Sequence, residues 1–137
     1  MPNKRDLRLD KYNIGTWAYR ELNNFCKQYK SKKRRLKELE SPYKSPQTTG
    51  MPSGSGPGDP TGRNAEKAAI LSNDIAMIEK AAKMASHSEY DLFLLAMTED
   101  VTWNYMRLLK NIRMNEKDFN DRRRRFYYLL ADMKGIV

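Results

Sequence analysis

Residues 101–133 read VTWNYMRLLKNIRMNEKDFNDRRRRFYYLLADM, and this stretch decides the fold. Thr102 is a residue type that caps the start of a helix, and Asn111 is one that tolerates the left-handed conformation at a helix end. Ile112 follows as an apolar residue that a turn can bury, and Asn115 can cap a second helix. The stretch therefore predicts a short helix, a tight turn and a longer helix.

The longer helix, expected over 115–134, has two different faces when its residues are placed at intervals of about 100°. Its apolar face consists of Phe119, Phe126, Leu129, Leu130 and Met133. Its polar face consists of Lys117, Asn120, Asp121, Arg124 and Tyr128, with Arg125 and Tyr127 beside it. Arg122 and Arg123 border the apolar face, so we expect their side chains to extend along it to water.

Together the two helices predict a helix–turn–helix unit whose second helix enters the major groove of DNA. Arg and Asn can bond guanine and adenine edges, but most of four successive arginines would contact phosphates instead. The residues predicted to contact bases or phosphates are Asn115, Lys117, Asn120, Arg122, Arg123, Arg124, Arg125 and Tyr128. The alternative is an ordinary helical hairpin whose basic face is only solvated.

Upstream of this unit, the spacing of apolar residues predicts further helices, and no segment alternates like a strand. A first helix over 15–40 is indicated by Leu22, Phe25, Cys26, Tyr29, Leu36 and Leu39. A second over about 60–86 follows the start signal Asp59-Pro60 and carries the stripe Leu71, Ile75, Ile78, Ala82 and Ala85. Its opposite face, with Asp74, Lys80 and Lys83, is expected to be solvated.

A third upstream helix, over 88–99, begins at Ser88 as a cap and is apolar on nearly every side. A helix of that composition is buried, so we place it at the centre of the protein. The fold class is all-α: a small helical bundle with a C-terminal helix–turn–helix over 101–134.

Residues 41–63 hold five of the seven glycines and five of the six prolines, which predicts a flexible loop. Its glycines lack the Gly-x-x-x-x-Gly-Lys-Ser/Thr pattern of a phosphate-binding loop. The loop separates a basic helical segment, 1–40, from the bundle over 64–137, and we expect the 137 residues to form one domain.

The net charge of +9 comes from 26 basic and 17 acidic residues, and it is unevenly distributed. Residues 1–40 hold twelve basic and five acidic side chains, residues 64–100 hold three and seven, and residues 101–137 hold nine and four. Basic ends of this kind attract polyanions. The residues predicted to make auxiliary phosphate contacts are Lys30, Lys32, Lys33, Arg34 and Arg35.

Several classes of protein are disfavoured by composition. No apolar run approaches the roughly 20 residues that span a bilayer, and the N-terminus lacks the apolar segment of a secretory signal, so we expect a cytoplasmic protein and no membrane partner. One cysteine and one histidine do not suit a zinc site. We predict no cofactor, no metal and no enzymatic activity. His87 is interpreted as a solvated residue at the junction between two helices. The side chains of Glu99 and Asp100 point in different directions on a helix, so they do not form a catalytic carboxylate pair.

Residues 101–112 are similar to the helix–turn–helix of sigma-factor region four, with an apolar residue and Thr opening the first helix and Ile in the turn. Arg107 stands where that region usually has alanine. Over 12–134 the chain resembles a group of small phage and prophage proteins of Gram-positive bacteria. The segments that carry this resemblance are 19–29 (YRELNNFCKQY), 45–61 (SPQTTGMPSGSGPGDPT) and 121–130 (DRRRRFYYLL).

The nearest functional analogy is to the RinA- and ArpU-type regulators of phage late genes, which implies activation of late transcription in contact with host RNA polymerase. The leading hypothesis is therefore a sequence-specific duplex-DNA-binding regulator in which residues 60–99 form a scaffold or a self-association surface. One alternative is a small terminase subunit, which packages DNA and assembles into rings. Another is a non-catalytic interaction module that acts on a host protein. RNA binding also stays open, because Tyr29 and Tyr43 could stack on unpaired bases.

Overall fold

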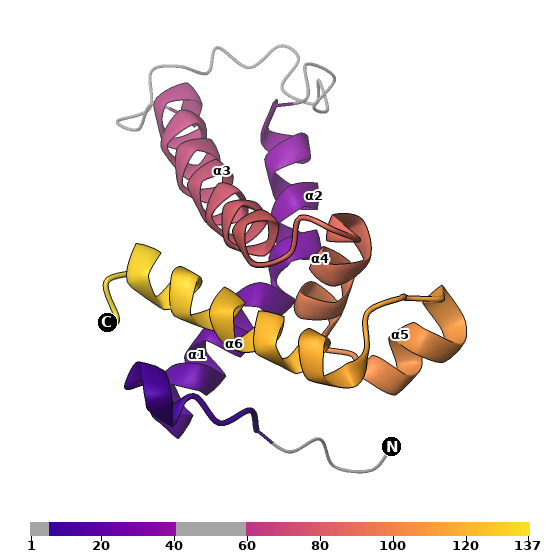
Figure 1. Ribbon diagram of the computed structural model, residues 1–137. Coiled ribbons are helices and arrows are strands. Elements are labelled where there is room, and N and C mark those ends of the chain that lie inside the picture. The colour runs from indigo at the N-terminus through magenta and orange to yellow at the C-terminus, as the bar shows by residue number, and fades with distance from the viewer. Residues whose placement is uncertain (1–5, 41–59) are drawn as a thin grey trace.

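A computed structural model describes residues 6–40 and 60–137 (Figure 1). Within these ranges a 3-10 turn, η1, is followed by six α-helices and no strand. The helices are α1 (Thr16–Lys27), α2 (Tyr29–Glu40), α3 (Pro60–Ala85), α4 (Tyr90–Glu99), α5 (Trp103–Lys110) and α6 (Glu116–Met133), and η1 is Asp10–Tyr12. The all-α class is confirmed.

Most of the predicted loop, 41–59, lies outside the described residues. Residues 60–63, which the predicted loop included, belong to α3, and the predicted helix start at Pro60 is confirmed. Proline suits that position, since the first helical residues have no partner for a backbone N–H.

Two helices form an arm and a third crosses beneath it (Figure 1). Tyr29 donates to the carboxylate of Glu79 and Lys32 pairs with Asp74, so α2 and α3 run antiparallel along each other. In Figure 1, α6 passes below the C-terminal end of α3, with α1 behind it and α5 at one side. α6 thus packs against α3 and α1, whereas α5 packs against α4.

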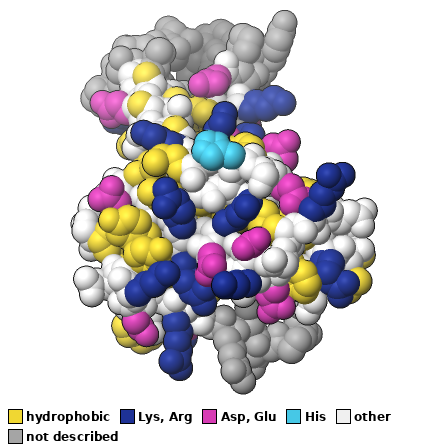
Figure 2. Space-filling model, viewed as in Figure 1, with side chains coloured by type: hydrophobic (Ala, Val, Ile, Leu, Met, Phe, Trp, Pro, Cys, Tyr) yellow, Lys and Arg dark blue, Asp and Glu magenta, His cyan; other side chains and the backbone are white. Residues whose placement is uncertain are grey.

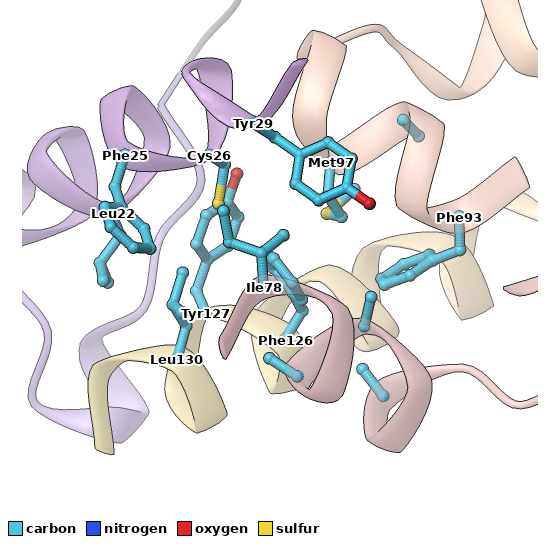
Figure 3. Close-up of a cluster of buried hydrophobic side chains, with 14 of the residues drawn as sticks. Leu22, Phe25, Cys26, Tyr29, Ile78, Phe93, Met97, Phe126, Tyr127 and Leu130 are labelled. Carbon is cyan, nitrogen blue, oxygen red and sulfur yellow. The ribbon is translucent and has the colours of Figure 1, made fainter. Parts of the chain in front are cut away.

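The core lies where α1, α3, α4 and α6 meet (Figure 3). Phe126 is fully buried and its ring makes edge-on contacts with Phe93 and Tyr127, at centroid distances of 6.0 and 5.1 Å. Such aromatic pairs add about 0.5–1.5 kcal/mol to the burial of their area. The predicted stripe of α3 is confirmed as part of the interior: Leu71, Ile75, Ile78, Ala82 and Ala85 are all buried.

The expectation of one continuous helix over 15–40 is wrong, because the helix breaks at Gln28. The N–H of Gln28 donates to Phe25 O at 3.3 Å, and the chain changes direction before α2 begins. The break lets the first half of the segment pack into the core, while Tyr29 and the rest of α2 follow α3. A single straight helix would carry α2 away from this second contact.

Two details of the 74–90 region also differ from the sequence interpretation. Asp74 is not merely solvated, since its carboxylate lies 3.0 Å from Lys32 Nζ. The predicted 88–99 helix starts at Tyr90, and Glu89, with φ of 54°, precedes it without a side-chain cap. Ser88 instead accepts a hydrogen bond from Arg122 at 2.7 Å. The environments of Asp74 and Ser88 therefore depend on side chains that are distant in the sequence, Lys32 and Arg122.

Tyr127 was expected beside the polar face of the last helix, but it is 1% exposed. Its hydroxyl accepts a hydrogen bond from Asn23 Nδ2 at 3.2 Å, and its ring meets Tyr19 edge-on. Burial raises the pKa of Tyr127 well above its usual value. A buried hydroxyl with a hydrogen-bond partner is tolerated in a core, so α6 buries a wider face than its aliphatic and Phe residues alone indicate.

We expect Phe126→Ala to lower the free energy of unfolding by about 3–5 kcal/mol, because it leaves a cavity among the rings that surround it. Urea denaturation followed by far-UV circular dichroism measures the change. Leu108→Ala is the control, since Leu108 is 65% exposed and its truncation should cost less than about 0.5 kcal/mol. Equal losses in the two variants would contradict the position of Phe126 in the core.

Cys26 should be unreactive in the folded protein. Its side chain is fully buried, and burial, followed by the nearby Asp100, raises the pKa of its thiol. Because the thiolate is the reactive form, we expect labelling by a thiol reagent at pH 8 to be slow in buffer and fast in denaturing urea. Equally rapid labelling under both conditions would contradict the described packing of α1.

Candidate nucleic-acid interface

The candidate interface is built on α5, α6 and the connection 111–115 between them. Thr102 Oγ1 accepts a hydrogen bond from the Tyr105 N–H at 3.2 Å, which caps the start of α5 as predicted. Met106 anchors the helix in the core with no exposed surface. On the outer side of α5, Arg107 and Lys110 are exposed.

The connection begins with the turn that the sequence predicted. Asn111 has φ of 58°, in the left-handed region, and its N–H donates to Met106 O. The Ile112 N–H donates to the same carbonyl at 3.1 Å, and the Ile112 side chain is 5% exposed. These bonds satisfy a carbonyl that the end of α5 would otherwise leave unpaired.

Two distant side chains then fix the connection. The carboxylate of Glu89 accepts hydrogen bonds from the Arg113 and Met114 N–H groups, at 2.8 and 3.1 Å. The indole Nε1 of Trp103 donates to Met114 O at 2.9 Å. Bonds to a charged acceptor are about twice as strong as neutral ones, so Glu89 ties the backbone before α6 to the start of α4. The sequence interpretation did not include Glu89 or this use of Trp103.

α6 starts as predicted, with Asn115 Oδ1 accepting from the Asp118 N–H at 2.8 Å. Asn115 and Lys117 are exposed, and Asn120 is partly exposed. Glu116 and Asp118 lie in the first turn, where negative side chains stabilise a helix. They also reduce the positive potential at this end, and Figure 2 shows acidic side chains among the Lys and Arg side chains of this face.

The four successive arginines have four different environments. Arg122 Nη1 donates to the hydroxyls of Ser86 and Ser88, at 2.8 and 2.7 Å, and so joins α6 to the junction between α3 and α4. Arg125 is exposed. Arg124 is partly exposed; its Nε donates to Arg8 O and its Nη1 lies 3.3 Å from Asp121. Arg124 thus lies on the polar face of α6, where its guanidinium also contacts the N-terminal segment and Asp121.

Arg123 does not reach water as expected, because it is 7% exposed. Its guanidinium lies 5.8 Å from the Phe119 ring centroid, and its Nη1 donates to Asn120 Oδ1 at 3.3 Å. Its Nε and Nη2 have no hydrogen-bond partner within the described ranges. In this conformation Arg123 is part of the interior and is not on the surface that the other predicted residues share.

The N-terminal segment covers part of α6. The ring of Tyr12 stacks on Tyr128 at a centroid distance of 4.8 Å, and Tyr128 is 37% exposed. Arg8, Asp10, Lys11 and Arg124 line a shallow hollow of about 300 Å³ beside this stack. The second half of α6 therefore shares its surface with the turn η1, a contact that periodicity along α6 alone cannot indicate.

Three cations near the connection were missed by the sequence interpretation: Arg107, Lys110 and Arg113, all exposed. Together with Lys117 and Arg125 they form what we call the connection surface. Arg107 also lies over the Trp103 ring, 5.2 Å from its centroid. The sequence could have indicated Arg107, Lys110 and Arg113 by their position at the end of the first helix and in the turn. In a helix–turn–helix these parts approach DNA together with the second helix.

The predicted auxiliary cations of α2 are not brought together with the first half of α6, although Lys32 and Lys134, at the end of α6, both lie over the Phe25 ring. Lys30 pairs with Glu99, and Lys32 pairs with Asp74 while lying over the Phe25 ring at 4.0 Å. Lys32 is thus a structural residue between α2 and α3. Lys33, Arg34 and Arg35 are exposed further along the arm, which points away from α6 in Figure 1.

No family model, curated protein or solved structure matches this chain. Among residues 6–40 and 60–137, no group of His, Cys, Asp or Glu side chains is arranged to hold a metal ion. His87 is exposed on the face shown in Figure 2. Within the same ranges, no helix is both long and apolar enough to cross a bilayer.

Glu89→Gln should loosen the connection, because one amide oxygen replaces the two carboxylate oxygens that accept from Arg113 and Met114. We expect a loss of about 1–2 kcal/mol in unfolding free energy, since hydrogen bonds to charged groups contribute about 1.5–3 kcal/mol. Amide exchange at both residues, followed by NMR, should also accelerate.

Asp91→Asn is the matched control for Glu89→Gln, because Asp91 is exposed in the first turn of α4. Its loss of charge should cost less than about 1 kcal/mol and leave exchange at the connection unchanged. Unaltered exchange in the Glu89 variant would show that the carboxylate does not hold this turn.

Proposed function

We propose that this protein is a sequence-specific duplex-DNA-binding regulator of phage late genes, with α5, the connection and α6 acting as a helix–turn–helix. The observation that carries the proposal is the connection surface, where four cations are exposed around a turn that Glu89 and Trp103 hold in place and a fifth, Arg125, is exposed further along α6. A recognition helix, which contacts base edges in the major groove, needs a fixed orientation. The turn sets the orientation of α6 relative to α5.

In the proposed complex the first half of α6 enters the major groove. Asn115, Lys117 and Asn120 lie at its start and are the candidates for base contacts, since amide and ammonium groups can bond base edges. The other four cations of the connection surface contact phosphates beside the groove, and such contacts supply affinity and register; they are Arg107, Lys110, Arg113 and Arg125. Arg122 holds α6 against the junction between α3 and α4, and Arg123 is buried against its own helix, so neither is assigned a DNA contact.

The acidic residues of α6 bear on specificity. Glu116, Asp118 and Asp121 are exposed beside the proposed contacts. Carboxylates repel phosphates but can accept from the exocyclic amine of cytosine. A helix with both signs of charge binds DNA less tightly at random sites than a purely basic one. The presence of both acidic and basic side chains on α6 therefore favours a sequence-specific DNA-binding protein over one that coats DNA without sequence preference.

A second candidate function is an interaction module that acts on a host protein. Leu108 and Leu109 on α5 are 65% and 64% exposed, and two adjacent exposed leucines suit a protein contact. The two functions are compatible, because a late-gene activator would also contact host RNA polymerase. A small terminase subunit is distinguished by its mass in solution, which would correspond to a ring.

Reversing two charges of the connection surface tests the proposal. Lys117→Glu with Arg125→Glu should weaken duplex binding about 100-fold, because each lost contact costs about 1–3 kcal/mol. Both residues are exposed, so the far-UV circular dichroism spectrum should not change. Fluorescence anisotropy with labelled DNA from the protein's own locus measures the affinity.

Arg63→Glu with Lys67→Glu is the matched control for this double variant. Both residues are exposed near the start of α3, and the change in net charge is the same. Its effect on affinity should be less than about threefold, as expected for a distant change of charge that is screened by salt. Equal weakening by the two double variants would show that net charge, and not the connection surface, determines binding.

A further inference from the structure

The outer face of α2 carries four cations in a row. Tyr29, Lys32, Leu36 and Leu39 are on the side of α2 that is packed or partly covered. At about 100° per residue, the stripe of Lys30, Lys33, Arg34 and Lys37 falls within one arc of about 100° on the remaining surface. All four are exposed, and we call them the α2 stripe.

Among residues 6–40 and 60–137, ion pairs engage one of the four members of this stripe. Lys30 pairs with Glu99, and Lys33 lies 5.3 Å from the centroid of the Tyr29 ring. The ion pairs between described residues do not include Lys33, Arg34 or Lys37. α2 holds six basic and two acidic residues, whereas α3 holds four and three. The excess of positive charge on the arm therefore lies on α2.

Most of the α2 stripe lies away from the first half of α6, although Lys30 pairs with Glu99 just before α5. Arg122 of α6 bonds Ser86, directly after α3, whereas Lys32 of α2 pairs with Asp74. Ser86 and Asp74 are twelve residues apart, which corresponds to about 18 Å at a rise of 1.5 Å per residue. Because α2 is antiparallel to α3, Arg34 and Lys37 lie still further from α6.

The chemistry of the stripe fits a phosphate backbone. The stripe has no apolar side chain, whereas the centre of a protein–protein interface is apolar and depleted in Lys. Flexible cations spaced along a helix make contacts that position a nucleic acid without reading its sequence.

We propose that the α2 stripe binds the phosphate backbone of a second DNA segment, so that one molecule bridges two duplexes. This inference rests on the proposed function, in which α6 binds the first duplex. The arm then holds a neighbouring segment through contacts that do not depend on sequence.

A capture assay tests the bridging. A duplex of about 30 base pairs is fixed to beads, a second labelled duplex of mixed sequence is added, and the labelled DNA retained by the protein is measured at low salt, where phosphate contacts are strongest. The wild-type protein should retain the second duplex. The triple variant Lys33→Glu, Arg34→Glu and Lys37→Glu should retain about tenfold less, while its affinity for a single duplex changes by less than about threefold.

The control variant is Arg63→Glu with Lys67→Glu and Lys80→Glu, which makes the same charge change on exposed positions of α3. Its capture of the second duplex should match that of the wild type. Undiminished capture by the α2 variant would overturn the inference, because bridging would then come from self-association or from another surface. Equal loss in both triple variants would also overturn it.

Single-duplex affinities separate this inference from the proposed function. If the α2 variant loses single-duplex binding and the Lys117→Glu, Arg125→Glu variant does not, the arm is the main DNA site and both proposals fail. If the connection-surface variant loses single-duplex binding but the wild type retains no second duplex, only the bridging fails.

Discussion

The burial of one face of α6 is the constraint on which the other elements depend. Phe119, Phe126, Tyr127 and Leu130 are each at most 1% exposed, and their neighbours come from α1, α3 and α4. Four buried side chains of this size contribute roughly 1.5–3 kcal/mol each relative to exposure. Because this face is fixed, the opposite side of α6 must meet solvent or a partner. Even the paired hydroxyl of Tyr127 and the guanidinium of Arg123 are held inside by the same packing.

The turn before α6 links this core to the proposed interface. Met106 and Ile112 are buried, so α5 and the connection are anchored from within. Glu89 and Trp103 bond the backbone of the same turn. A site held by rigid neighbours loses less conformational entropy on binding than a mobile loop. This turn therefore gives a physical reason why exposed cations at the end of α5 and in the connection can act together with the start of α6.

Local signals explain what the sequence could predict. Thr102, Asn111 and Asn115 act on backbone groups within three to five residues, and the structure has each of these caps where the sequence indicated. The α3 stripe follows equally from helical spacing. The break at Gln28, the bonds of Glu89 and the burial of Tyr127 and Arg123 depend on partners far away in the chain, which spacing along one helix cannot reveal. For the same reason the charge map could not show that Lys33, Arg34 and Lys37 lie on the part of the arm that points away from α6.

Binding of the wild-type protein to duplex DNA across a salt series tests the central claim most directly. The comparison needs DNA from the protein's own locus, an unrelated duplex and a single strand. The account predicts preference for the local duplex and a steep fall in affinity with salt, with each phosphate contact contributing about −0.9 to the logarithmic slope. No duplex binding at low salt, or equal binding to the single strand, would contradict the assignment of α6 as a DNA-reading helix.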